Sequence, residues 1–117
     1  MIQQNPTYKR GEVVLVLFPD SNLTTIKPRP ALVVQADNLQ TGLRQVIIAM
    51  ITSNLSRANH PSRVTILLSS PEQSGLLTDS VVMTDNLATV GSPEIDCVIG
   101  WLPMTKVDIA LRHTLNL

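Results

Sequence analysis

The sequence predicts one mostly β domain, a small curled barrel of five or six strands with a C-terminal helix. Two patterns predict this fold. Short apolar runs rich in β-branched residues alternate with turn signals through most of the 117-residue chain, which is typical of antiparallel strands. From Pro103 onward the apolar residues instead recur at steps of three and four, as in an amphipathic helix. A chain of this length buries a single core, so we expect one domain over residues 1–117.

The first three strands are predicted in the N-terminal half. The run EVVLVLF, residues 12–18, stops at Pro19, which has no backbone N–H for a sheet ladder. The run ALVVQA, residues 31–36, begins after Pro30, and proline is tolerated where a strand starts. The run QVIIAMIT, residues 45–52, follows the turn TGLR.

Three more strands and a helix complete the predicted fold. The runs RVTILL, SVVMTD and DCVIGWL give strands at 63–68, 80–85 and 96–102. Several runs are apolar on both faces, as in a small barrel whose outer face is also covered. Pro103 suits a first helical position, but Leu102 is a poor N-cap, so the helix start can shift by a residue or two. The apolar stripe of the helix consists of Met104, Val107, Leu111 and Leu115.

Three long loops separate these elements, at 19–29, 53–62 and 69–79. Long loops in a small domain often carry function. The first two are polar and contain cations, so we expect the functional residues there rather than on the strands.

Composition argues against several classes of site. Tyr8, Phe18 and Trp101 are the only aromatic residues, too few for a platform that stacks single-stranded bases. The single cysteine, Cys97, allows neither an intrachain disulfide nor a thiolate metal site, and we expect it to be buried. No apolar run reaches the roughly 18 residues of a membrane span, and the N-terminus does not resemble a signal peptide. We therefore expect a cytoplasmic protein without metal, cofactor or membrane contact.

The charge is balanced overall but unevenly distributed. Residues 1–63 carry seven Lys and Arg against three Asp and Glu, a net charge of +4, and residues 64–117 carry −4. This asymmetry allows a local basic surface on a neutral protein.

Arg29 stands between two prolines at the start of a predicted strand. Proline fixes its own φ near −65°, and Pro30 also restricts Arg29 to extended conformations. A guanidinium held in this way is suited to a planar anion such as a carboxylate or phosphate. The alternative is a solvated arginine that merely precedes a strand.

The chain resembles the MazF/PemK-type toxins of bacterial toxin–antitoxin pairs, from Lys9 to the terminal helix. The resemblance lies in the order and spacing of five segments: KRGEVVLVLFPD, KPRPALVVQ, VIIAMITSN, HPSRVTI and DSVVMTDNLATV. It implies an SH3-like small barrel of the MazF/CcdB type that forms a homodimer and is neutralised by a cognate antitoxin. DNA would be contacted only indirectly, through the antitoxin complex.

The same resemblance implies a sequence-selective, metal-independent endoribonuclease that cleaves single-stranded RNA, above all mRNA. Arg29 corresponds to the arginine of the family's RP motif, and Thr52 to the hydroxyl residue that ends the third strand. Asp85 corresponds to an aspartate that takes part in some relatives. These three are the expected catalytic residues.

The chain also departs from the family. Asn86 and Ala88 replace a glutamine and an arginine of many relatives, and Met83 replaces an arginine of others. These departures leave open a catalytically degenerate or non-enzymatic binding module, either an antitoxin-binding remnant or a CcdB-like gyrase inhibitor. The CcdB alternative is disfavoured because CcdB-type toxins use a tryptophan at the extreme C-terminus, whereas this chain ends in RHTLNL.

Metal-free RNA cleavage needs a base for the 2′-hydroxyl, a cation at the phosphoryl oxygens and an acid for the 5′-oxygen. Arg29 suits the cation and Thr52 can donate to phosphate, whereas Asp85 and His60 are alternative bases. The residues expected to contact RNA are Lys27, Ser53, Asn54, Arg57 and His60.

Overall fold

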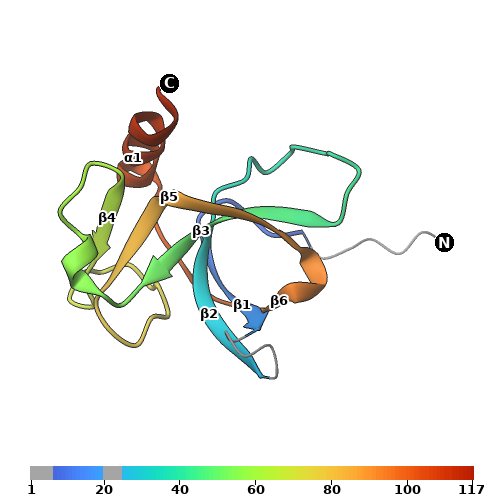
Figure 1. Ribbon diagram of the computed structural model, residues 1–117, viewed down its shortest axis with the longest axis horizontal. Helices are drawn as coiled ribbons and strands as arrows, with labels where there is room; N and C mark the ends of the chain where they lie inside the picture. The colour runs from blue at the N-terminus through green and yellow to red at the C-terminus, as the bar shows by residue number, and fades with distance from the viewer. Residues whose placement is uncertain (1–6, 20–24) are drawn as a thin grey trace.

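The computed structural model describes residues 7–19 and 25–117. Six strands form one antiparallel sheet in the spatial order β4-β5-β3-β2-β1-β6 (Figure 1). One α-helix, α1 (Thr105–Leu115), packs on β4 and β5. The strands are β1 (Glu12–Pro19), β2 (Ile26–Val33), β3 (Gln45–Thr52), β4 (Arg63–Ile66), β5 (Ser80–Gly91) and β6 (Ile95–Trp101). Two short 3₁₀ turns are η1 (Leu55–Arg57) and η2 (Ser92–Glu94).

The core occupies both faces of the curled sheet. Alternate residues of β1 point to opposite sides, so Val13 joins one buried cluster and Val14 the other. The first cluster includes Val107 of α1 and therefore lies under the helix. The second includes Val46 and Ile95 and is formed by strands alone. The expectation of a mostly β domain with a C-terminal helix, and of strands that are apolar on both faces, is confirmed.

The helix differs from its predicted stripe only at its end. Val107 is buried and Leu111 packs against the core, but Leu115 is exposed because the last turn extends past the sheet (Figure 1). Met104 at the N-cap makes no side-chain capping bond. Arg10 ties the helix to the start of β1, since its Nη2 lies 2.5 Å from Asp108 Oδ1. No helix in the described part of the chain is long and apolar enough to cross a membrane.

The first loop is shorter than predicted, because β2 begins at Ile26 rather than after Pro30. Residues 26–30 pair with β1, whereas β3 pairs only with 31–33, so the prolines adjoin a free strand edge. Proline is tolerated at such an edge because no ladder bond is required of its nitrogen. Lys27 and Arg29 are therefore strand residues, not loop residues. Residues 20–24 of the predicted loop lie outside the described residues.

Strand β5 is twice as long as predicted and is interrupted by an irregularity. Ala49 of β3 pairs with Leu87, but the next residue, Met50, pairs with Met83. Residues 84–86 are therefore extra on the β5 side, as in a β-bulge. Because these residues are polar, the apolar pattern stops here, and the sequence does not predict that the strand continues to Gly91.

The expectation that Cys97 is buried is wrong, since it is exposed. It lies on the edge strand β6, where only Ile95 is buried. Ile95 and Ile99 of β6 pack in or against the core clusters, whereas Cys97 belongs to neither cluster.

Candidate functional site

An open groove with a volume of about 770 Å³ lies where β2, β3 and β5 meet the 69–79 loop. Arg29 and Thr52 both line it, together with Lys27 and Ser53. Among the described residues that line the groove, Lys27 and Arg29 are the only ionisable side chains, and most of the rest are aliphatic. The groove therefore has a positive charge on an apolar floor.

Arg29 is exposed, and its backbone is restricted both by strand pairing and by the neighbouring prolines. It pairs with Val16 in the β1–β2 ladder, and it is flanked by Pro28 and Pro30, which also line the groove. Few backbone conformations are therefore available to it. The side chain projects from a fixed strand rather than from a loop, which favours a defined position for its guanidinium.

Thr52 ends β3 and is half-buried. Its Oγ1 accepts a hydrogen bond of 3.1 Å from the backbone N–H of Asn54. A hydroxyl has one proton and two lone pairs, so this bond uses a lone pair and leaves the proton free for another acceptor. A phosphate oxygen in the groove is an acceptor of this kind.

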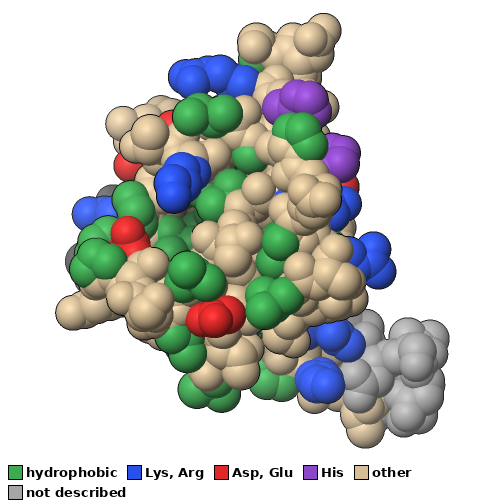
Figure 2. All heavy atoms as spheres, turned by 90° about the vertical axis from the view of Figure 1, so that its left-hand side faces the viewer, with side chains coloured by type: hydrophobic (Ala, Val, Ile, Leu, Met, Phe, Trp, Pro, Cys, Tyr) green, Lys and Arg blue, Asp and Glu red, His purple; other side chains and the backbone are tan. Residues whose placement is uncertain are grey.

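The segment after Thr52 is ordered by its own polar groups. Asn54 Oδ1 accepts from Ser56 N–H at 3.1 Å and from Ser56 Oγ at 2.7 Å, which caps η1. Ser53 lines the groove, whereas Asn54 and Arg57 continue along the loop beyond it. Figure 2 shows the face formed by β4 and its flanking loops, with Lys and Arg side chains toward both of its edges.

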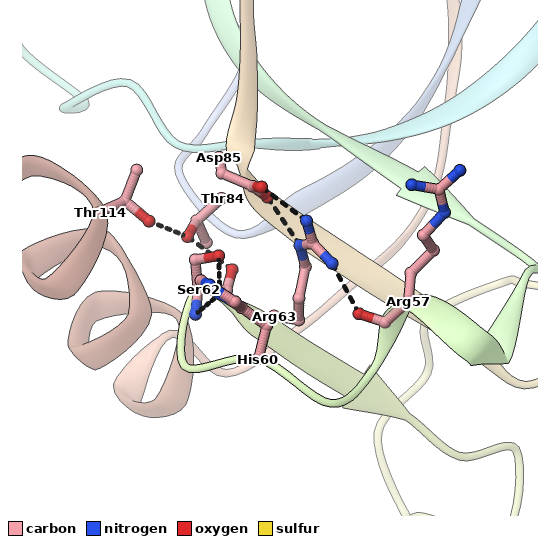
Figure 3. A network of polar contacts seen from close by, with 7 residues as sticks. All are labelled: Arg57, His60, Ser62, Arg63, Thr84, Asp85 and Thr114. Carbon is pink, nitrogen blue, oxygen red and sulfur yellow. Dashed lines mark hydrogen bonds and ion pairs between the residues drawn. The ribbon is translucent and has the colours of Figure 1, made fainter.

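Asp85 does not line the groove but forms a bidentate ion pair with Arg63 (Figure 3). Its two carboxylate oxygens accept from Arg63 Nε at 2.8 Å and from Nη2 at 2.6 Å. Hydrogen bonding from Arg63 lowers the pKa of Asp85, so the carboxylate stays ionised and is a weak base. The same pair raises the pKa of the Arg63 guanidinium.

His60 is also separate from the groove lining. Its Nδ1 accepts from the Ser62 N–H at 3.1 Å and lies 2.7 Å from Ser62 Oγ. Its ring meets that of His113 on α1 edge to face, with 6.1 Å between centroids. Both residues expected as the base therefore have partners elsewhere.

The far wall of the groove is the 69–79 loop, which sequence analysis did not select. A Cβ on Gly75 would lie 2.1 Å from the Ile99 carbonyl oxygen, and one on Gly100 would lie 2.3 Å from that of Gln73. The loop and β6 are thus in backbone contact that only glycine permits. Leu77 of this wall is 93% exposed.

Two of the departures from the resembled family lie in the groove. Met83 and Asn86 line it, so apolar and amide groups occupy part of the β5 side. Ala88, in contrast, is half-buried and packs against the second core cluster.

Two of three comparisons with known proteins found matches to this chain. Residues 9–115 match the family model for the PemK-like, MazF-like toxin of type II toxin–antitoxin systems. Comparison with curated proteins gives no match.

Solved structures with the same architecture were also found. An endoribonuclease from a mycobacterial species, in complex with its cognate antitoxin, is 26% identical with a TM-score of 0.72, over 94% of this chain and 96% of that chain. A second mycobacterial endoribonuclease is 25% identical with a TM-score of 0.71, over 96% and 94%. A MazE–MazF structure from Deinococcus radiodurans, at 18% identity and a TM-score of 0.72 over 97% and 99%, shares the fold.

Proposed function

Because the chain belongs to the family of PemK-like, MazF-like toxins of type II toxin–antitoxin systems, we propose that it is an endoribonuclease neutralised by a cognate antitoxin. Its substrate is single-stranded RNA, above all mRNA, and it acts in the cytoplasm as a homodimer. The structural neighbours described as endoribonucleases, one of them in complex with its antitoxin, support this proposal.

The observation that carries the proposal is the shared groove of Arg29 and Thr52. A guanidinium presents parallel N–H donors that fit two phosphate oxygens, and it remains charged at every physiological pH. Arg29 is therefore the clamp that stabilises the charge that builds on the phosphoryl oxygens. The Thr52 hydroxyl donates to the same phosphate and fixes its orientation.

The reaction that this arrangement serves is an internal transesterification. The 2′-oxygen of the RNA forms a bond to phosphorus while the bond from phosphorus to the 5′-oxygen breaks. One proton leaves the 2′-hydroxyl and one is added to the 5′-oxygen, which gives a 2′,3′-cyclic phosphate and a 5′-hydroxyl end. Arg29 and Lys27 supply positive charge at this step without a metal ion.

Selectivity for sequence requires groups that contact bases. Asn86 lines the groove and has an amide that can both donate and accept. Met83 and Leu77 provide an aliphatic surface for an unstacked base where aromatic side chains are scarce.

The proposal is tested by incubating the purified chain with a long single-stranded RNA in EDTA. We expect fragments with 5′-hydroxyl ends. Arg29→Ala should lower kcat by about 10²–10³-fold, the usual effect of losing a preorganised donor to a developing charge. Thr52→Val, which keeps the shape but removes the hydroxyl, should lower it by about 10–100-fold.

Arg44→Ala is the matched control, because Arg44 is an exposed cation outside the groove lining. Its rate should stay close to that of the unaltered chain. Full activity in Arg29→Ala would remove the clamp role. Intact RNA in the presence of the unaltered chain would instead support the degenerate binding module.

A further inference from the structure

Arg63, the first residue of β4, uses every nitrogen of its guanidinium group (Figure 3). Nε and Nη2 bind the two carboxylate oxygens of Asp85 on β5. Nη1 donates to the backbone carbonyl oxygen of Arg57 at 2.8 Å. One planar side chain thus connects β5 to the last residue of η1.

This connection holds a segment that contains the proposed RNA contacts. The 53–62 loop begins directly after Thr52 and presents Ser53, Asn54 and Arg57. Figure 3 shows the Arg57 guanidinium pointing away from the polar network, so its carbonyl is held while its side chain stays free. The loop is therefore fixed through its backbone and leaves its cation available to a ligand.

The connection is well suited to positioning because it is partly shielded. The Arg63 side chain is 17% exposed and that of Asp85 is 37% exposed. Bidentate pairs specify orientation as well as distance, and lysine cannot reproduce the fork of three donors. Loss of either partner leaves the other without its hydrogen bonds.

A second and independent connection holds the other end of the loop. The Ser62 carbonyl oxygen accepts from the Thr84 N–H at 3.0 Å and from Thr84 Oγ1 at 2.7 Å. Since the single Thr84 hydroxyl proton is used there, Thr114 of α1 must be the donor in their 2.7 Å contact. Breaking the Arg63–Asp85 pair should therefore loosen η1 without releasing the whole loop.

We propose that Arg63 and Asp85 are positioning residues that hold the 53–57 segment in the shape that binds the RNA backbone. This inference rests on the proposed function. It assigns Asp85 a role through Arg63, with no contact to the reacting phosphate, in place of proton transfer. Arg63, which sequence analysis did not select, is the central residue of the pair.

The test compares Asp85→Asn, Arg63→Lys and the double variant Arg63→Ala/Asp85→Ala with the unaltered chain. The substrate is a short RNA that spans a mapped cleavage site, and the inhibitor is the same RNA with a 2′-deoxy sugar at that site. We expect each variant to raise KM and the Kd of the 2′-deoxy RNA about tenfold, with kcat nearly unchanged, because a misplaced contact weakens binding. The double variant should raise KM and Kd no more than a single variant does, since both residues act as one unit.

Two readouts separate positioning from a merely structural role or from base catalysis. The pH dependence of kcat should keep its shape in Asp85→Asn, whereas removal of a general base would abolish one limb and lower kcat at constant KM. Amide hydrogen exchange of residues 54–58 should accelerate in Arg63→Lys but not in Thr114→Val, which weakens only the second connection. The inference would be overturned if Asp85→Asn lost one limb of the pH dependence of kcat. It would also be overturned if Arg63→Lys left both the amide exchange of residues 54–58 and KM unchanged.

Failure of the proposed function has a different signature. If the unaltered chain neither cleaves nor binds RNA while exchange still accelerates in Arg63→Lys, the loop connection stands and the nuclease proposal falls. Thermal unfolding of each variant checks that the fold is retained.

Discussion

Arg29 and Arg63 show how the same residue type has different uses in this molecule. Arg29 is exposed on β2 and aims at an open groove, where its guanidinium is available to a ligand. Each of the three guanidinium nitrogens of Arg63 donates a hydrogen bond to another group of the protein. A free guanidinium can bind phosphate, whereas one that is hydrogen-bonded within the protein fixes the chain around it. The side chain of Asp85 is the partner of the bound guanidinium and is therefore part of the group that fixes the chain.

The acid stability of the protein should depend on Asp85. Arg63 lowers the pKa of this carboxyl in the native state, so the pair stabilises the fold above the unfolded-state value of about 3.9. This contribution is lost as pH falls through the lowered native pKa. The difference in unfolding free energy between the unaltered chain and Asp85→Asn should therefore be largest near neutral pH and shrink below about pH 4.

Urea unfolding at pH 7 and pH 3 measures this difference. Glu94→Gln removes an equal charge from an exposed site and controls for net charge. A difference that is the same at both pH values would show that the ion pair does not contribute in this way.

At the scale of elements, irregular points in regular strands direct the side chains in and around the candidate site. The irregularity in β5 aims three consecutive residues at three targets: Thr84 at the Ser62 carbonyl, Asp85 at Arg63 and Asn86 at the groove. A continuous strand would alternate them between only two faces.

The groove wall should depend on the glycine contacts between the 69–79 loop and β6. Gly100→Ala places a Cβ within 2.3 Å of backbone atoms of Gln73 and Ser74, which cannot yield without moving the loop. We expect a loss of about 1–3 kcal/mol in unfolding free energy, as for other overpacked sites, and a raised KM. Gly91→Ala, whose Cβ would meet atoms no nearer than 3.7 Å, is the control. Equal stability of the two variants in urea would contradict this account of the wall.

At the scale of the whole molecule, a neutral chain presents a cationic groove. The nine basic and nine acidic residues cancel, but the described lining of the groove contains Lys27 and Arg29 and no acidic side chain. The carboxylate of Asp85 lies outside the groove lining, and its charge is neutralised by Arg63. The proposed RNA substrate would therefore be attracted to this groove although the protein as a whole is not basic.

Binding of single-stranded RNA should weaken with salt in proportion to the phosphates neutralised. Three contacts, from Lys27, Arg29 and Arg57, give a slope of log K against log salt of about −2, at roughly −0.7 each. Lys27→Ala should reduce the slope by about 0.7. Lys106→Ala, an exposed cation on α1, is the control. Titrations with the 2′-deoxy RNA at several salt concentrations measure the slopes, and an unchanged slope in Lys27→Ala would exclude its phosphate contact.

Local signals in the sequence determined most of the fold. The alternation of runs rich in β-branched residues with turn signals predicts the strands, and β3 has the predicted bounds, 45–52. The spacing after Pro103 gave α1 because helical periodicity is a property of neighbouring residues. Arg29 is also a candidate on local grounds, since its two neighbouring prolines restrict its backbone wherever the strand lies.

Only the tertiary structure decided which of these residues meet. Arg63 and Asp85 are 22 residues apart, and Gly75 and Ile99 are 24 apart, so no local pattern reveals their contact. The early start of β2 at Ile26 depends on a free edge, and the targets of Thr84, Asp85 and Asn86 depend on the register of β3 against β5. Periodicity reports which side of an element is buried, whereas pairing and register are set by the packing of distant segments. The groove shared by Arg29 and Thr52 is a product of that packing.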